Sequence, residues 1–166
     1  WINLSTIKDH LSDSLLSTLD TKLKTTTKNI QADAYEYYLK GKYKFVKRNN
    51  IKDVEISRKY LQKSLDIDKN LLIAEMMLGK TYKDYDYEKS ISIYKNVSNK
   101  ARLIKDMNSL AEGLNNIGAL LTSNQKLDGV ENYLLEAISI NKENNNLEGM
   151  AHNLTNIGSI YIQQGD

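Results

Sequence analysis

Apolar residues recur every three or four positions along most of the chain, with polar residues between them. Over residues 1–24 the apolar positions are Leu4, Ile7, Leu11, Leu15, Leu19 and Leu23. This spacing places the apolar side chains on one face of an amphipathic helix. The same pattern predicts eight helices and no strand, near residues 1–24, 32–48, 53–67, 71–83, 87–99, 103–122, 127–142 and 147–163.

The first predicted helix is expected to be separate from the others. Thr25-Thr26-Thr27 is predicted to end it, because β-branched hydroxyl residues form helices poorly and can bond their own backbone. We expect residues 1–30 to form a linker or a packing helix that covers one open end of the remaining helices.

A five-residue segment occurs twice in the second half of the chain. Leu114-Asn115-Asn116-Ile117-Gly118 returns as Leu154-Thr155-Asn156-Ile157-Gly158, 40 residues later. A looser copy contains Gly79, which lies 39 residues before Gly118, and Gly41 lies 38 residues before Gly79. A period near 40 predicts a solenoid of helical hairpins. We expect repeats at about 32–69, 70–108 and 109–147, and a half repeat at 148–166. Gly118 should lie where the two helices of a hairpin approach each other closely.

The residues around these glycines resemble the tetratricopeptide repeat (TPR) family. The first helix of that repeat has a large residue, then Leu-Gly three and four positions later, then Tyr. The matching residues here are Leu154, Ile157, Gly158 and Tyr161; Leu114, Ile117, Gly118 and Leu121; and Glu75, Leu78, Gly79 and Tyr82. The resemblance implies an all-α, right-handed TPR-like superhelix with an N-terminal packing helix. The chain departs from the family in having no proline, in its longer steps and in Glu75, which stands at a usually apolar position.

A second resemblance covers about 45 residues at the start of the chain. Ala32-Asp33-Ala34-Tyr35-Glu36-Tyr37-Tyr38-Leu39-Lys40-Gly41-Lys42-Tyr43 resembles the segment that opens the repeat region of bacterial class III adenylate/guanylate cyclases. This implies the C-terminal part of a multidomain signalling protein, with any cyclase chemistry outside these residues. The same opening occurs in some repeat-bearing transcription activators and kinases, so a peptide-sensing region of such a protein is the alternative.

Composition narrows the classes of partner. The formal net charge of +2 does not indicate nucleic acid or an anionic membrane. Without cysteine, disulfides and thiolate zinc sites are excluded. No apolar run approaches the roughly 20 residues that a membrane span needs. We expect a cytoplasmic protein, and the chain begins and ends as a piece of a longer one would.

No group of residues has the spacing of a catalytic or metal site. His10 and His152 each lack a second ligand at metal-binding spacing. Gly113 and Gly118 lie inside a predicted helix, and no Gly-Lys-Ser/Thr follows them, so they do not form a phosphate loop. We therefore expect no enzymatic activity and no cofactor in this segment, and a protein or peptide as its partner.

The concave face of the first helices is the candidate binding site. In the TPR family this face is built by recurring positions of each first helix. The resemblance assigns to it Ile73, Met76, Met77, Lys80, Glu112, Asn115, Asn116, Ala119, His152, Thr155, Asn156 and Ser159. Asn116 and Asn156 occupy the same position one repeat apart, and amides there can hold an extended peptide by its backbone. The alternative is that they bond a neighbouring helix or water.

The last predicted helix, 147–163, lacks the second helix of its repeat. Leu154, Ile157 and Tyr161 are therefore expected to have incomplete cover. An uncovered apolar stripe tends to bind another surface, often a second copy of itself. We expect self-association through this helix, as a consequence of the absent second helix rather than as the biological assembly.

Overall fold

The computed structural model describes residues 4–165, and these form seven α-helices without a strand. The helices are α1 (Leu4–Val46), α2 (Ile51–Ile67), α3 (Leu72–Tyr82), α4 (Tyr87–Ile104), α5 (Met107–Ser123), α6 (Val130–Glu143) and α7 (Leu147–Gln164). The all-α prediction is confirmed. None of these helices is both long enough and apolar enough to cross a membrane.

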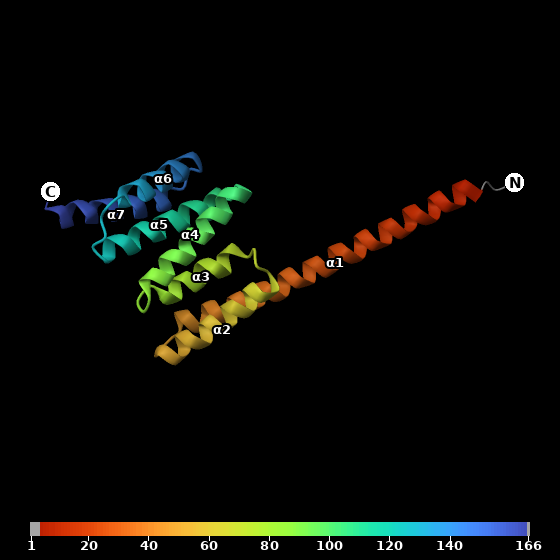
Figure 1. Ribbon diagram of the computed structural model, residues 1–166, viewed down its shortest axis with the longest axis horizontal. Helices are drawn as coiled ribbons and strands as arrows, with labels where there is room; N and C mark the ends of the chain where they lie inside the picture. Colours follow the sequence, from red (N-terminus) through yellow and green to blue (C-terminus); the bar gives the residue numbers. More distant parts are fainter. Residues whose placement is uncertain (1–3, 166) are drawn as a thin grey trace.

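The helices pack in chain order as antiparallel hairpins. The C-terminal part of α1 pairs with α2, α3 pairs with α4, and α5 pairs with α6, while α7 packs on α5 and α6 (Figure 1). The largest group of buried apolar side chains joins the second and third hairpins through Leu72, Met76, Ile91, Tyr94, Val97, Ala101, Leu110, Leu114, Ile117, Leu120 and Ala137. Smaller groups join α1 to α3 through α2, and α6 to α7. Each hairpin therefore contacts mainly its neighbours.

The prediction that Thr25-Thr26-Thr27 ends the first helix is wrong. The helix α1 continues through all three, so the two predicted helices at 1–24 and 32–48 are one, and there are seven helices rather than eight. Each threonine hydroxyl donates a hydrogen bond to the carbonyl oxygen four residues earlier, at 2.9 Å. Such bonds satisfy the hydroxyl inside a helix, so three threonines weaken the helix without ending it.

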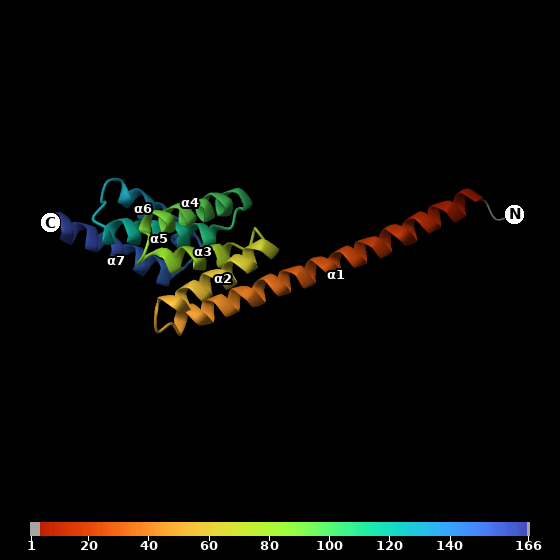
Figure 2. The ribbon, with the colours of Figure 1, turned by 60° about the horizontal axis from the view of Figure 1, so that its bottom comes forward.

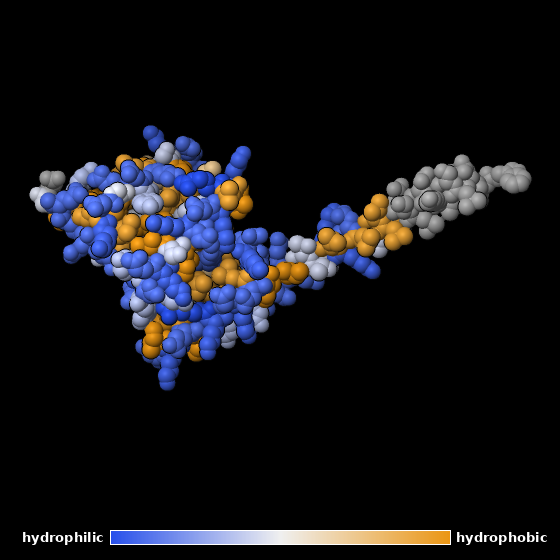
Figure 3. Space-filling view, in the orientation of Figure 1, coloured by the Kyte–Doolittle hydropathy of each residue, from blue (hydrophilic) through white to orange (hydrophobic). Residues whose placement is uncertain are grey.

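The N-terminal part of α1 does not cover the end of the hairpins. It projects away from the other helices (Figures 1 and 2), and every residue from Leu15 to Asp33 is exposed. The hydropathy surface shows apolar side chains along this projecting part (Figure 3). Leu15, Leu16, Leu19 and Leu23 are each more than half exposed. The expected packing helix is thus a free-standing extension in the described residues.

The predicted close contact at Gly118 is confirmed and is common to three hairpins. A Cβ atom would lie 2.7 Å from Leu61 Cγ at Gly41, 2.7 Å from Tyr94 Cε1 at Gly79, and 2.7 Å from Leu134 Cγ at Gly118. Side chains do not approach a Cβ atom this closely, so glycine is required for the second helix to pack on the first. At Gly158 no atom of the described residues lies within 4 Å of the same position.

The end of α4 and the start of α6 differ from the predicted boundaries, and in both places a residue with positive φ makes the turn. The helix α4 runs five residues further than predicted, and Lys105 ends it in the left-handed conformation, with φ 59°. Asp106 then caps α5 by accepting from the Ser109 N–H. Gly129, at φ 70°, delays the start of α6 to Val130. After α6 the chain turns at Asn145, which has the left-handed conformation, with φ 55°.

Candidate functional site

The first helices of successive hairpins line a row of connected hollows. The hollows have volumes of 300, 550 and 220 Å³, and Lys80 and Asn116 line all three. The first hollow lies between α1, α3 and α5, and the second between α3, α5, α6 and α7. This row is called the groove below.

Most of the predicted site residues lie in the groove. Ile73, Met76 and Met77 line its first hollow, and Ala119 lines the third. Glu112, Asn115, Asn116 and His152 line the second and largest, together with Lys80. The spacing of a shared repeat therefore brings residues from α3, α5 and α7 to one surface.

Three predicted residues lie outside these hollows. The hydroxyls of Thr155 and Ser159 donate to the carbonyl oxygens of Ala151 and Thr155, four residues earlier in α7. The Asn156 amide donates instead to Asn115 Oδ1, at 2.8 Å. For Asn156, the alternative of a bond to a neighbouring helix is what the structure shows.

A chain of asparagine amides forms one wall of the groove. Asn146 Oδ1 accepts from the Gly149 N–H, and Asn146 Nδ2 donates to Asn141 Oδ1 at 3.0 Å. Asn141 Nδ2 donates to Asn153 Oδ1, and Asn153 Nδ2 donates to Asn115 Oδ1, both at 2.9 Å. Asn153 is completely buried and Asn141 is 4% exposed. These bonds fix α5, α6 and α7 relative to one another, since an unpaired buried amide would cost free energy.

Two amide groups on α5 retain free capacity. Asn115 uses its Oδ1 twice, but its Nδ2 donates to no described residue. Asn116 donates from Nδ2 to Met76 Sδ at 3.3 Å, and its Oδ1 accepts from no described residue. Adjacent residues of one helix thus present a donor and an acceptor at the groove, which are the two functions needed to pair with a peptide unit.

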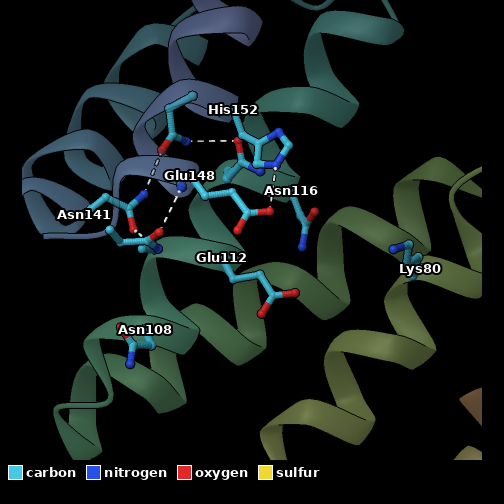
Figure 4. Close-up of a pocket in the computed structure, with 12 residues that line it drawn as sticks. Lys80, Asn108, Glu112, Asn116, Asn141, Glu148 and His152 are labelled. Carbon is cyan, nitrogen blue, oxygen red and sulfur yellow. Dashed lines mark hydrogen bonds and ion pairs between the residues drawn. The ribbon is translucent and has the colours of Figure 1, made fainter. Parts of the chain in front are cut away.

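Charged side chains of both signs border these amides. In Figure 4, Glu112 and Asn116 from α5 lie between Lys80 of α3 and the α7 pair Glu148 and His152. Glu148 Oε1 is 3.7 Å from His152 Nε2, and both side chains are exposed. The groove therefore offers separate contacts to a cationic and an anionic group of one ligand.

One buried tyrosine lines the third hollow of the groove. Burial raises the pKa of Tyr94, which lines the third hollow, to about 12, so its hydroxyl is protonated at neutral pH. Within residues 15–165, no three His, Asp or Glu side chains lie together so that they could hold a metal ion.

Sequence reasoning missed several residues of the groove. Asn108, Asn141, Asn146, Glu148 and Asn153 line its largest hollow, and Tyr38 and Lys42 line the first. The residue equivalent to Asn153 in the preceding repeat is Gly113, 40 residues earlier, so the repeat pattern did not indicate an amide at this position. The density of asparagines between 141 and 156 was the available signal.

No protein-family model matches the sequence, and no curated protein is similar to it. The groove and its free amides are therefore the basis for a functional proposal.

Proposed function

We propose that this chain is a non-catalytic interaction module of the TPR type, which binds an extended segment of a protein along the groove. The observation that carries the proposal is the pair of free amide functions at Asn115 Nδ2 and Asn116 Oδ1. An extended chain presents an unpaired N–H and C=O every residue, and a donor and an acceptor side by side suit it. The repeat spacing of 40 residues and the hairpin packing support the TPR assignment.

The groove favours a polar, charged peptide over an apolar one. Its largest hollow is lined by asparagines, Lys80, Glu112 and Glu148. The hollow between α1, α3 and α5 adds apolar side chains from Ile73, Met76 and Met77. The third hollow adds smaller apolar contributions from Ala119 and Leu120. Methionine side chains adapt to different partners. The ligand that fits best carries one apolar anchor for the methionines and charged residues on either side.

The likeness of residues 32–43 to the opening of the cyclase repeat region supports a further proposal, that the module belongs to a cyclase-type signalling protein. In that setting its role is partner binding or assembly. The continuous helix α1 then links the groove directly to whatever precedes it, since Tyr38 and Lys42 line the groove and belong to the same helix as the extension.

A peptide-array experiment tests groove binding. Peptides that bind the chain are re-measured against Lys80→Ala with Asn116→Ala, which removes an exposed cation and the free acceptor. One hydrogen bond and one ion pair contribute about 1 kcal/mol each, so Kd should rise roughly thirtyfold. The matched control is Asn132→Ala with Lys142→Ala, exposed residues of α6 that do not line the groove. Peptides that bind both double variants equally would exclude the groove as their site.

A further inference from the structure

The three complete hairpins share one pattern on their second helix. A large side chain covers the glycine of the first helix: Leu61, Tyr94 and Leu134. Four residues before it stands a small residue or valine, and three residues after it another: Ser57 and Ser64, Ser90 and Val97, Val130 and Ala137. All six of these flanking residues are buried.

Hydrogen bonds show how closely this pattern fits the first helix. Ser57 Oγ donates to the Gly41 carbonyl at 2.8 Å, and Ser90 Oγ donates to the Gly79 carbonyl at 2.9 Å. Ser64 Oγ donates to the Ala34 carbonyl at 2.6 Å, seven residues further along each helix of the antiparallel hairpin. The partner of such a glycine is thus a helix with a small residue, a large residue four positions later, and a small residue three positions after that.

The helix α7 presents the same glycine surface without a partner. No described atom lies within 4 Å of a Cβ at Gly158. Ala151 is exposed, whereas its repeat equivalents Ala34, Leu72 and Ala111 are 0%, 7% and 3% exposed. Leu154 is 56% exposed and Tyr161 45%. This apolar face is opposite the one that Asn153 and Ile160 bury against the rest of the molecule.

The same face of α7 also has the spacing of small and large residues that the second helix of each hairpin shows. Gly158 stands four residues before Ile162, and Gly165 stands three residues after it. Ile162 is 77% exposed, so it is free to act as the large residue. The helix α7 thus has both an open notch, the space above Gly158, and a side chain, Ile162, that fits the notch of a second copy. A surface that is complementary to itself is the condition for a two-fold symmetric contact.

We propose that two copies of this chain associate through α7, antiparallel about a two-fold axis at Gly158, so that Ile162 of each copy packs on Gly158 of the other. Leu154 and Tyr161 flank the contact on the same face. No other helix of the described residues covers this face of α7 (Figure 1). A single helix pair is a small interface, so we expect a weak dimer, with Kd on the order of 100 μM.

Sedimentation velocity of the whole chain, at concentrations around this Kd, tests the proposal. Gly158→Leu fills the notch and Ile162→Gln removes the apolar side chain, and each should raise the dimer Kd by about tenfold or more. Neither change should affect folding, since nothing packs on Gly158 and Ile162 is largely exposed. The matched control is Leu103→Gln in α4, whose side chain is 83% exposed and which should leave the dimer unchanged.

A swapped pair tests the specific contact. Gly158→Leu combined with Ile162→Ala moves the large side chain from position 162 to position 158. The dimer Kd of this double variant should be lower than the effects of Gly158→Leu and Ile162→Ala, each measured alone, together predict. The proposal is overturned if the wild-type chain stays monomeric well above this concentration. It is equally overturned if Gly158→Leu still dimerises as wild type does, or if Leu16→Gln with Leu23→Gln in α1 abolishes the dimer, which would place the contact on the α1 extension.

Discussion

Glycines that are equivalent in sequence have unequal roles at the residue scale. Gly118 and Gly158 occupy the same position of the repeat, but only Gly118 faces a side chain, Leu134. A helical glycine without such a contact is a weak point, because alanine has the higher helix propensity. The same residue type is therefore required in one repeat and replaceable in the next.

This contrast gives a matched pair of variants. Gly118→Ala should destabilise the chain by about 1–3 kcal/mol, because the added methyl group meets Leu134. Gly158→Ala should instead stabilise it by up to about 1 kcal/mol. Urea denaturation of the two variants and the wild type measures both effects. Equal effects at the two positions would mean that Gly158 is covered by a side chain.

Tyr94 gives a prediction for alkaline pH. Burial raises its pKa from 10.0 in the unfolded chain to about 12 in the folded one. As pH rises above 10, the unfolded chain loses this proton first, so stability present below pH 10 is lost between pH 10 and 12. The loss should be on the order of 2 kcal/mol.

The control for this titration is Tyr94→Phe, which keeps the ring that packs on Gly79 and removes the ionisable hydroxyl. Denaturation curves across this pH range should show the wild type losing that stability relative to the variant, since every other ionisation is common to both. Parallel pH profiles would show that the folded protein ionises Tyr94 as readily as the unfolded chain does.

At the scale of the element, α1 combines two different environments in one helix. Ala34, Tyr38 and Phe45 are buried, and Tyr38 and Lys42 line the groove. By contrast, all residues from Leu15 to Asp33 are exposed. A helix of exposed residues is only marginally stable by itself. The packed C-terminal part supplies the nucleus from which the extension continues.

Removal of residues 1–30 therefore should not change the stability of the hairpins. The free energy of unfolding should stay within about 0.5 kcal/mol of the full chain, since no side chain of the described part of this segment is buried. The helical circular dichroism signal should fall in proportion to the residues removed. Leu61→Ala is the contrasting variant, because it empties a fully buried site on α2 and should cost about 2–5 kcal/mol. A shortened chain destabilised as much as Leu61→Ala would contradict the extension.

At the scale of the whole molecule, stability is expected to be uneven along the row of hairpins. The helix α5 has eight buried residues and neighbours on both sides. The helix α7 has two, Asn153 and Ile160. In a linear stack the terminal unit has only one neighbouring interface, so it opens at a lower free-energy cost than the units inside.

Native-state hydrogen exchange should show this gradient. Amides in α7 should exchange through local opening, several kcal/mol below the free energy of global unfolding, whereas amides in α4 and α5 should exchange only with global unfolding. Measurement at low protein concentration keeps a dimer from protecting α7. Equal protection of α5 and α7 would show that the chain unfolds as a single cooperative unit.

The sequence by itself determined the helices and the positions of closest approach, because both are periodic. The 3.6-residue period specifies an apolar face wherever the helix lies, and the step of 38–40 residues marks Gly41, Gly79 and Gly118. The groove residues that were predicted came from the resemblance to the TPR family, in which equivalent positions of stacked first helices share one surface. The helix continues through Thr25-Thr26-Thr27 against their low helix propensity, because the hydroxyls bond to carbonyl oxygens of the same helix.

Only the tertiary structure decided what each repeated residue touches. The Asn141–Asn153–Asn115 bonds join residues up to 38 positions apart on three helices, and no local pattern specifies such partners. The Asn156 amide makes a separate bond to Asn115 Oδ1, and Asn115 Nδ2 and Asn116 Oδ1 remain free at the groove. Likewise, Gly118 and Gly158 look alike in sequence, and the presence or absence of a neighbouring helix makes one a buried contact and the other an open surface. Periodic features depend on the chain near each residue, whereas burial and hydrogen-bond partners depend on which distant segments arrive beside it.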